Sequence, residues 1–264
     1  MDVTEVVADL LAEQGALDAI VAPLSAAQMA LPTPSPRWTV ADQLAHLTYF
    51  DGNAALAITD PEAFTATVHA LIAASSGGDE ALDEFELGAW RNLAPDELRA
   101  AWRANRELLA IAGAGLSNTD RIEWYGPSMG SKSFLTARLM EVWAHGQDIV
   151  DAVGADRPAT DRIRHIAQLG YITRKWSYIN RGMEAPEGDV AVVLAAPSGD
   201  TWTWGDDNDN RVTGPAEDFC LVVTQHRHVE DTALEITGER ARDWLVRAQA
   251  FAGPATDGPY AKGA

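Results

Sequence analysis

The segment from Leu139 to Gly154, LMEVWAHGQDIVDAVG, places polar residues within an otherwise apolar helical pattern. The three that could do chemistry are Glu141, His145 and Asp148. Because helical residues advance by about 100°, His145 lies at about 40° and Asp148 at about −20° from Glu141, on one shared face. Glu141 and His145 could therefore hold one metal ion from adjacent turns. They could equally form a surface pair that contributes only a few tenths of a kcal/mol.

A third metal ligand would have to come from another helix, and His46 is the best candidate. It lies in ADQLAHLTYFD, among Leu44, Leu47 and Phe50, so a helix in this segment would direct its ring inward. Two imidazoles and one carboxylate leave a fourth position of Zn²⁺ open, which is typical of catalytic rather than structural sites. The alternative is a core histidine that is hydrogen bonded to a carbonyl oxygen.

Other polar and aromatic residues could support such a site. Asp148 could accept a hydrogen bond from His145 and fix its tautomer, or it could contact Arg138 or cap a neighbouring helix. Trp38, Trp124 and Tyr125 could line a pocket around the metal, although core packing is the common role of such rings. Trp124 and Tyr125 belong to WYGPSMG, a long connection just before the metal-ligand helix, which favours contact with a ligand.

The chain reads as mainly α, with β-strand patterns only near its C-terminal end. We predict an up-down helical bundle over residues 1–184, followed by a small α+β domain over residues 185–264. Thr39 with Asp42 predicts a capped helix start, and Pro61 predicts another. The remaining predicted helices are 3–24, 94–114, 133–153, 160–179, 216–228 and 239–253; the predicted strands lie within 189–197, 198–206, 210–216 and 232–238, and 75–80 is a predicted loop.

Composition limits the partners and the compartment. The net charge of −19 argues against nucleic acid and anionic membranes, because both require a basic surface. No apolar run reaches about 18 residues, and the N-terminus is acidic, so we expect neither a membrane span nor a signal peptide but a cytoplasmic protein, monomeric or homodimeric. The single cysteine, Cys220, lies in the apolar run DFCLVV, which indicates a buried structural thiol rather than a nucleophile.

Two motifs, WTVADQLAHLTYFD and RLMEVWAHGQDIVDAVG, carry a family resemblance. They resemble the DinB-like metal-binding bundles, in the branch of mycothiol-dependent maleylpyruvate isomerases and their actinobacterial relatives. That branch has one histidine on the second bundle helix and a Glu-x3-His pair on a later helix, which match His46, Glu141 and His145. The C-terminal part is similar to that branch's small α+β domain, which is reminiscent of sterol carrier proteins. An arginine there helps to bind substrate, and Arg227 is the nearest match.

The resemblance implies an enzyme that uses zinc, or another divalent transition metal, to activate a low-molecular-weight thiol such as mycothiol. The thiol, coordinated as a thiolate, would attack a small electrophilic substrate, so we expect a transferase or isomerase with Arg227 and Asp148 in catalytic roles. One alternative is a hydrolase or lyase that uses metal-bound water, with Asp148 or Asp51 as the base. The other is a bundle that binds a small ligand without catalysis.

Overall fold

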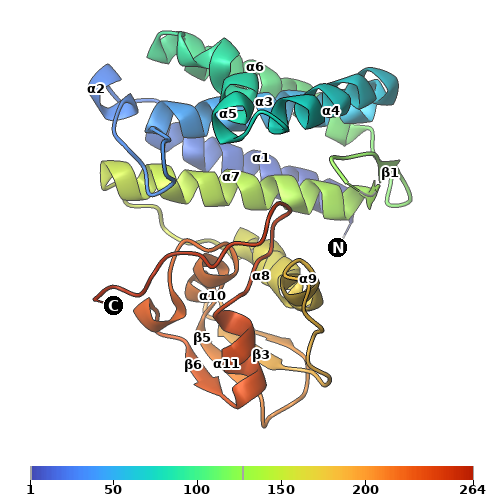
Figure 1. Ribbon diagram of the computed structural model, residues 1–264, viewed down its shortest axis with the longest axis vertical. Coiled ribbons are helices and arrows are strands. Elements are labelled where there is room, and N and C mark those ends of the chain that lie inside the picture. The colour runs from blue at the N-terminus through green and yellow to red at the C-terminus, as the bar shows by residue number, and fades with distance from the viewer. Residues whose placement is uncertain (1, 127, 264) are drawn as a thin grey trace. The chain divides into compact units, whose positions relative to one another are not determined.

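The computed structural model describes residues 2–126 and 128–263. The chain divides into two compact units, Met1–Asp156 and Arg157–Ala264. The structure is mostly helical, with a small sheet in the second unit (Figure 1), so the predicted fold class is confirmed. Within the described part of the chain, no helix has the length and apolarity needed to cross a membrane.

Helices dominate the first unit, and a two-stranded hairpin precedes its last helix. The elements are α1 (Val3–Val21), α2 (Ala26–Met29), α3 (Val40–Thr59), α4 (Pro61–Ser75), α5 (Asp79–Arg91), α6 (Pro95–Ala114), β1 (Arg121–Ile122), β2 (Met129–Gly130) and α7 (Ser131–Val153).

Local sequence signals set the starts of α3 and α4. The hydroxyl of Thr39 accepts a hydrogen bond from the backbone N–H of Asp42, and the Asp42 carboxylate accepts one from the backbone N–H of Thr39, 2.9 Å away. This reciprocal cap satisfies N–H groups that have no partner within the helix. Pro61 begins α4, where its missing N–H costs nothing. Both predicted helix starts are confirmed.

The bundle core is built from the helical periodicity. Helix α3 packs against α6 and α7, and α1 packs against α7 and α6; Figure 1 shows α1 and α7 side by side along the unit. The inward side chains include Leu17, Leu44, Leu47, Trp102 and Leu139, each with no exposed surface. Burying a leucine contributes about 2 kcal/mol, so these apolar stripes supply the main stabilisation.

One buried carboxylate connects four of these helices. Asp51 of α3 accepts hydrogen bonds from Gln14 of α1 at 3.0 Å and from the indole Nε1 of Trp102 in α6 at 3.2 Å. Its other oxygen pairs with Arg138 of α7 at 3.0 Å. Asp51 is 0% exposed. Asp51 was predicted, under the hydrolase or lyase alternative, as one of two candidate bases beside a metal; it instead belongs to the bundle core.

The second unit combines short helices with a four-stranded sheet. The strand order is β4-β3-β5-β6, in which β3 pairs parallel with β5 and the two outer pairs are antiparallel. Its elements are η1 (Asp161–Ile163), α8 (Arg164–Ile172), α9 (Arg174–Ile179), β3 (Ala191–Ala195), β4 (Thr201–Trp204), β5 (Arg211–Pro215), α10 (Ala216–Val223), η2 (Val229–Asp231), β6 (Glu235–Thr237) and α11 (Glu239–Leu245).

The boundary between the units differs from the predicted position between residues 184 and 185. It lies after Asp156, close to Gly154, which ends α7 in the left-handed conformation at φ 64°. Helices α8 and η1 belong to the second unit because they pack on α10. Gly170 of α8 approaches Val223 so closely that an added Cβ would lie 2.7 Å from its side chain. Periodicity shows that a helix is amphipathic, but it does not show which core it covers.

Several predicted helix limits also need correction. The predicted helix 160–179 is η1, α8 and α9, interrupted at Thr173. The predicted helix 216–228 ends at Val223, and Gln225 then takes a φ of 60°. The predicted helix 239–253 ends at Leu245. No helix was predicted where α5 lies: its first residues were predicted as loop, and the rest of the segment was left unassigned. Two of its buried positions carry acids, which hide the apolar periodicity.

Replacement of Asp51 by asparagine should destabilise the bundle by about 3 kcal/mol, because it removes the carboxylate that pairs directly with the buried charge of Arg138. Urea denaturation measures the change. The matched control is Arg103→Gln, which removes an ion pair with Asp18 at 2.9 Å. The side chain of Arg103 is 46% exposed, so this pair lies at the surface. The control should cost under about 1 kcal/mol. Equal losses for the two variants would contradict the assignment of Asp51 as the central connector.

Candidate metal centre

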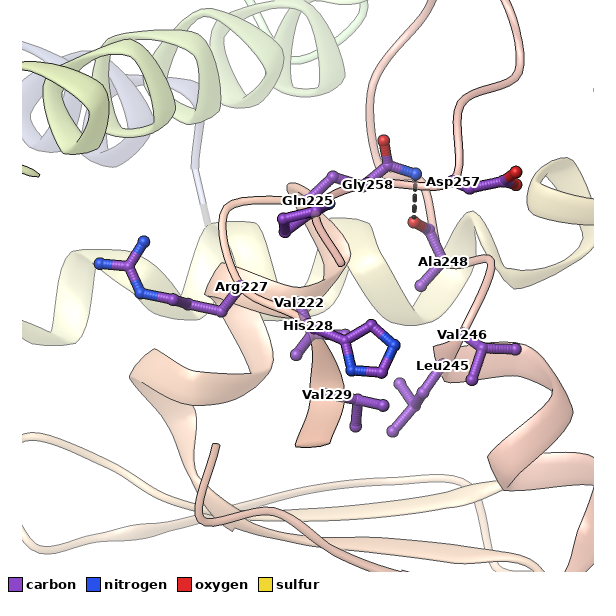
Figure 2. Close-up of a pocket in the computed structure, with 11 residues that line it drawn as sticks. Val222, Gln225, Arg227, His228, Val229, Leu245, Val246, Ala248, Asp257 and Gly258 are labelled. Atoms are coloured by element: carbon purple, nitrogen blue, oxygen red, sulfur yellow. Dashed lines mark hydrogen bonds between the residues drawn. The ribbon is translucent and has the colours of Figure 1, made fainter. Parts of the chain in front are cut away.

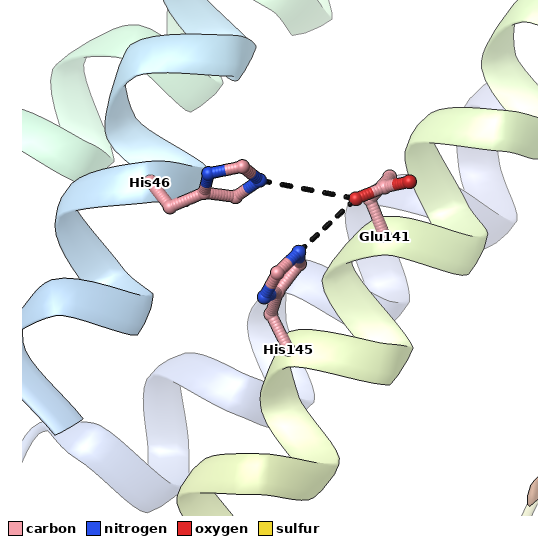
Figure 3. Close-up of side chains that lie close together, drawn as sticks. All are labelled: His46, Glu141 and His145. Atoms are coloured by element: carbon pink, nitrogen blue, oxygen red, sulfur yellow. Dashed lines mark hydrogen bonds and ion pairs between the residues drawn. The ribbon is translucent and has the colours of Figure 1, made fainter. Parts of the chain in front are cut away.

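The three residues predicted as metal ligands lie together in the structure. His46 comes from α3, and Glu141 and His145 come from adjacent turns of α7, with both rings directed toward the carboxylate (Figure 3). Glu141 Oε2 is 3.1 Å from Nε2 of His145 and 3.9 Å from Nε2 of His46. One ligand atom from each residue lies within 4.8 Å of the others. A surface pair of Glu141 and His145 alone does not describe this arrangement.

The outer nitrogen of His46 is held by a carboxylate. Nδ1 of His46 lies 3.3 Å from Oε2 of Glu86, on α5. Glu86 is buried, with 7% of its surface exposed. A carboxylate accepts hydrogen bonds, so this contact places a ring proton on Nδ1, and in the neutral ring the lone pair of Nε2 is directed toward Glu141.

The outer nitrogen of His145 is held by an amide whose orientation is itself fixed. Nδ1 of His145 lies 2.6 Å from Oε1 of Gln43. The amide nitrogen of Gln43 donates to Asp148 at 2.7 Å and to the Thr33 hydroxyl at 3.0 Å. Because a carboxylate only accepts, the NH₂ group of Gln43 must face Asp148 and its oxygen must face His145. The ring proton of His145 is therefore on Nδ1, and its Nε2 faces Glu141.

The role expected for Asp148 changes with this geometry. Direct contact with His145 was one of the roles predicted for Asp148, whereas the structure places the Gln43 side chain in the chain of hydrogen bonds between them. Asp148 also accepts a hydrogen bond from the Ser35 hydroxyl, in the loop before α3. Asp148 is 4% exposed, so it acts as a buried anchor for Gln43.

The pKa values of the cluster reflect burial and mutual contacts. Burial disfavours the charged form of Glu141, but hydrogen bonds to His145 and His46 outweigh it and hold the pKa of Glu141 well below its ordinary value. Burial also opposes charge on His46, yet its contacts with Glu141 and Glu86 raise its pKa. Burial and the neighbouring His46 lower the pKa of His145. The metal-free cluster therefore favours a proton on His46.

The hydrogen-bond pattern fits a bound cation. Both rings face an acceptor at each nitrogen, namely Glu86 or Gln43 on the outside and Glu141 on the inside. A neutral imidazole has only one N–H, and the outer contacts use it. The inner nitrogens and the Glu141 oxygen therefore need a proton or a metal ion between them. Two imidazole nitrogens and a carboxylate oxygen are a ligand set suited to zinc and other divalent transition metals.

Trp38, one of the rings offered above as a pocket wall, lies against the cluster. Its ring is stacked on His145 with centroids 5.9 Å apart and lies 5.0 Å from the ring of His46. The indole Nε1 donates to Asp83 of α5 at 3.1 Å. Arg37, which has a φ of 70°, donates to the same carboxylate at 3.2 Å. These contacts keep the Trp38 ring over the histidines.

Trp124 and Tyr125 lie one ring further away. The ring of Phe50 is 4.5 Å from that of His46, and the rings of Tyr125 and Trp124 lie 5.5 Å and 6.3 Å from Phe50. Trp124 also stacks on Phe64 at 5.3 Å. Both residues therefore belong to an aromatic cluster that reaches the histidines through Phe50.

Arg227 belongs to the second unit, in the segment after α10. Its Nη1 donates to the backbone carbonyl of His226 at 2.7 Å. It borders a hollow with a cavity volume of about 10 Å³, which has room for about one water molecule. Figure 2 shows the Arg227 side chain extending away from His228 and Val229, which also line the hollow. The substrate-binding role expected for Arg227 therefore stays a prediction.

Sequence reasoning missed two residues that hold the rings, Gln43 and Glu86. Gln43 lies three residues before His46, so helical spacing alone could have identified it as a neighbour on the same face. Glu86 lies in α5, where no helix was predicted. Its position three residues after Asp83 places both acids on one face of that helix, which is the signal that could have found it.

The first unit is thus a helical bundle whose two-histidine, one-carboxylate cluster spans α3 and α7, and the second is a small α+β unit. This combination defines a class of helical-bundle proteins with a candidate divalent-metal centre. The sequence profile of the mycothiol maleylpyruvate isomerase N-terminal domain matches residues 10–150. The chain belongs to the mycothiol maleylpyruvate isomerase family, which confirms the predicted resemblance.

Two relatives match this chain over most of its length, and two solved structures share its fold. The uncharacterized proteins MT0041 and Rv0036c, from two strains of Mycobacterium tuberculosis, are 45% identical over 250 residues, covering 94% of this chain and 95% of each relative. Crystal structures of the mycothiol-dependent maleylpyruvate isomerase share the fold. A histidine-to-alanine variant is 18% identical, with a TM-score of 0.59 over 89% of this chain and 93% of that chain. A second structure is 20% identical, with a TM-score of 0.56 over 90% and 95%.

Cys220 should be unreactive in the native protein. It is 0% exposed, its thiol donates to the carbonyl of Ile163 at 3.4 Å, and burial raises its pKa well above the ordinary value. We expect Ellman's reagent to leave the folded protein unmodified over minutes and to detect its single cysteine after addition of guanidinium. Rapid modification under native conditions would contradict the assignment of Cys220 as a structural thiol.

Proposed function

We propose that this protein is a metal-dependent enzyme that uses a low-molecular-weight thiol, such as mycothiol, in a transfer or isomerisation reaction of a small electrophilic substrate. The observation that carries the proposal is the convergence of two Nε2 atoms on Glu141, with both outer Nδ1 atoms already held by acceptors. Membership of the mycothiol maleylpyruvate isomerase family supports a thiol-dependent isomerase or transferase.

His46, Glu141 and His145 would hold the metal, with zinc as the first candidate. A divalent ion in such a site would supply Lewis acidity, which promotes loss of the proton from a coordinating thiol. The chain supplies three ligands, so one position is left for the thiol. The chain's own thiol is unsuited to this role, because Cys220 is fully buried in the second unit. The nucleophile would therefore come from outside the protein.

The surrounding residues would position the reactants and limit access of water. Gln43 and Glu86 fix the ring orientations of the two histidines. Trp38 covers the histidines on one side, and Phe50 contacts His46. These rings offer an apolar wall to the carbon skeleton of a small substrate. Arg227 is kept as a proposed binder of a substrate carboxylate.

A metal-dependent hydrolase or lyase gains less support from the structure. That function needs a carboxylate base outside the ligand set but within reach of the metal. Asp51 is engaged by Arg138 and two neutral donors in the bundle core. Asp148 is engaged by Gln43 and Ser35. Both acids named for that role hold the fold around the cluster.

Metal content and thiol binding test the proposal directly. The purified protein should bind about one equivalent of zinc, and His46→Ala or His145→Ala should lose it, because each removes a ligand from a three-residue set. The matched control is His69→Ala, which removes an exposed histidine and should keep the metal. Elemental analysis gives the metal content. In the Co²⁺-substituted protein, mycothiol should add a thiolate charge-transfer band; its absence at saturating thiol would sink the thiol-dependent function.

The affinity for zinc should depend on pH through His46. Because contacts with Glu141 and Glu86 raise the pKa of His46, the metal must displace a proton from this ring at any pH below that pKa. Affinity should fall by up to about tenfold per pH unit on that acidic side and level off above the pKa. Isothermal calorimetry in buffers of different ionisation enthalpy measures the proton released. His69→Ala should give the same profile as wild type. A zinc affinity that does not change between about pH 5.5 and 8 would contradict this mechanism.

A further inference from the structure

We propose that Glu86 is a positioning residue of the metal centre, which acts on the metal through His46 and sets the affinity of the site. This inference rests on the proposed metal-dependent function. It assigns a role to α5, the helix that the sequence analysis left out. The role is separate from that of the ligands, because Glu86 contacts the outer nitrogen of His46 and not the inner one.

The position of Glu86 is determined by packing and by a second acid. Helix α5 packs against α3, which carries His46. One turn before Glu86, Asp83 accepts hydrogen bonds from the Trp38 indole and from Arg37, both in the segment that leads into α3. Asp83 and Glu86 are 8% and 7% exposed. The two acids thus anchor α5 at the cluster, with one holding the Trp38 loop and the other holding the ligand His46.

The two histidines are held by acceptors of different charge. His46 faces the carboxylate of Glu86, whereas His145 faces the neutral amide of Gln43. A hydrogen bond to a carboxylate is stronger than one to an amide and makes the opposite ring nitrogen a better electron donor. The negative charges of Glu86 and Glu141 together match the charge of a divalent ion. His46 should therefore be the stronger of the two imidazole ligands, and Glu86 is the reason.

Competition with a chromophoric zinc chelator tests the role of Glu86. Glu86→Gln keeps a hydrogen-bond acceptor but loses the charge, and should weaken zinc binding about tenfold; Glu86→Ala loses both and should weaken it by up to about a hundredfold. The matched control is Glu84→Gln, an equal charge change at an exposed position of α5, which should stay within about twofold of wild type. If Glu86→Gln binds zinc as tightly as wild type, the inference is overturned.

Thermal unfolding separates positioning from a structural role. Without metal, Glu86→Gln and wild type should unfold within a few degrees of each other. With saturating zinc, the rise in Tm should be smaller for Glu86→Gln, because stabilisation by a ligand follows its affinity. An equal rise for both proteins would overturn the inference while leaving the metal site intact. A wild-type protein that gains no stability and binds no zinc would instead overturn the proposed function, and the inference with it.

Discussion

The buried pair of Asp51 and Arg138 is the interaction on which the candidate site depends. It joins α3 to α7 at 3.0 Å, with both side chains almost fully buried. His46 precedes Asp51 by five residues on α3, and Glu141 follows Arg138 by three on α7. A slip of either helix along the other would separate these charges in the core, at a cost of several kcal/mol. The pair that stabilises the bundle therefore also fixes the register in which the candidate ligand from α3 meets the two candidate ligands from α7.

A second set of contacts fixes the rotation of the rings. Helix register brings the ligands close, but an imidazole can still present either nitrogen. Glu86 and Gln43 remove that freedom by taking the Nδ1 side of His46 and of His145. Asp148 determines which nitrogen of His145 carries the proton. Its carboxylate can only accept a hydrogen bond, so it binds the NH₂ group of Gln43 and leaves the Gln43 oxygen facing the ring. Buried polar groups would destabilise an apolar core, but here Glu86, Gln43 and Asp148 each have a hydrogen-bond partner that offsets their burial.

The sequence predicted the three residues of the cluster better than the elements around them. The spacing of Glu141 and His145 depends only on the helical period, and His46 lies among apolar neighbours, so the position of each motif could be predicted from the sequence. Helix α5 could not be predicted in this way, because Asp83 and Glu86 occupy its buried face, where periodicity predicts apolar residues. The buried state of Asp51 was also missed, since its three partners lie on helices that only the tertiary fold brings together. The unit boundary depends on tertiary packing in the same way.

The arrangement of fixed outer contacts has a consequence for a reaction that exchanges ligands. If the cluster holds an ion at which a thiol exchanges, His46 and His145 must keep their orientation, because rings free to rotate would release the ion or adopt unproductive geometries. Here the histidines are held from the side opposite the proposed metal position, by groups that a thiol would not need to displace. The exchange would then cost little reorganisation, which is the advantage of a preorganised site. In the proposed enzyme, Glu86 and Gln43 would therefore hold both rings in place while the fourth ligand of the ion exchanges.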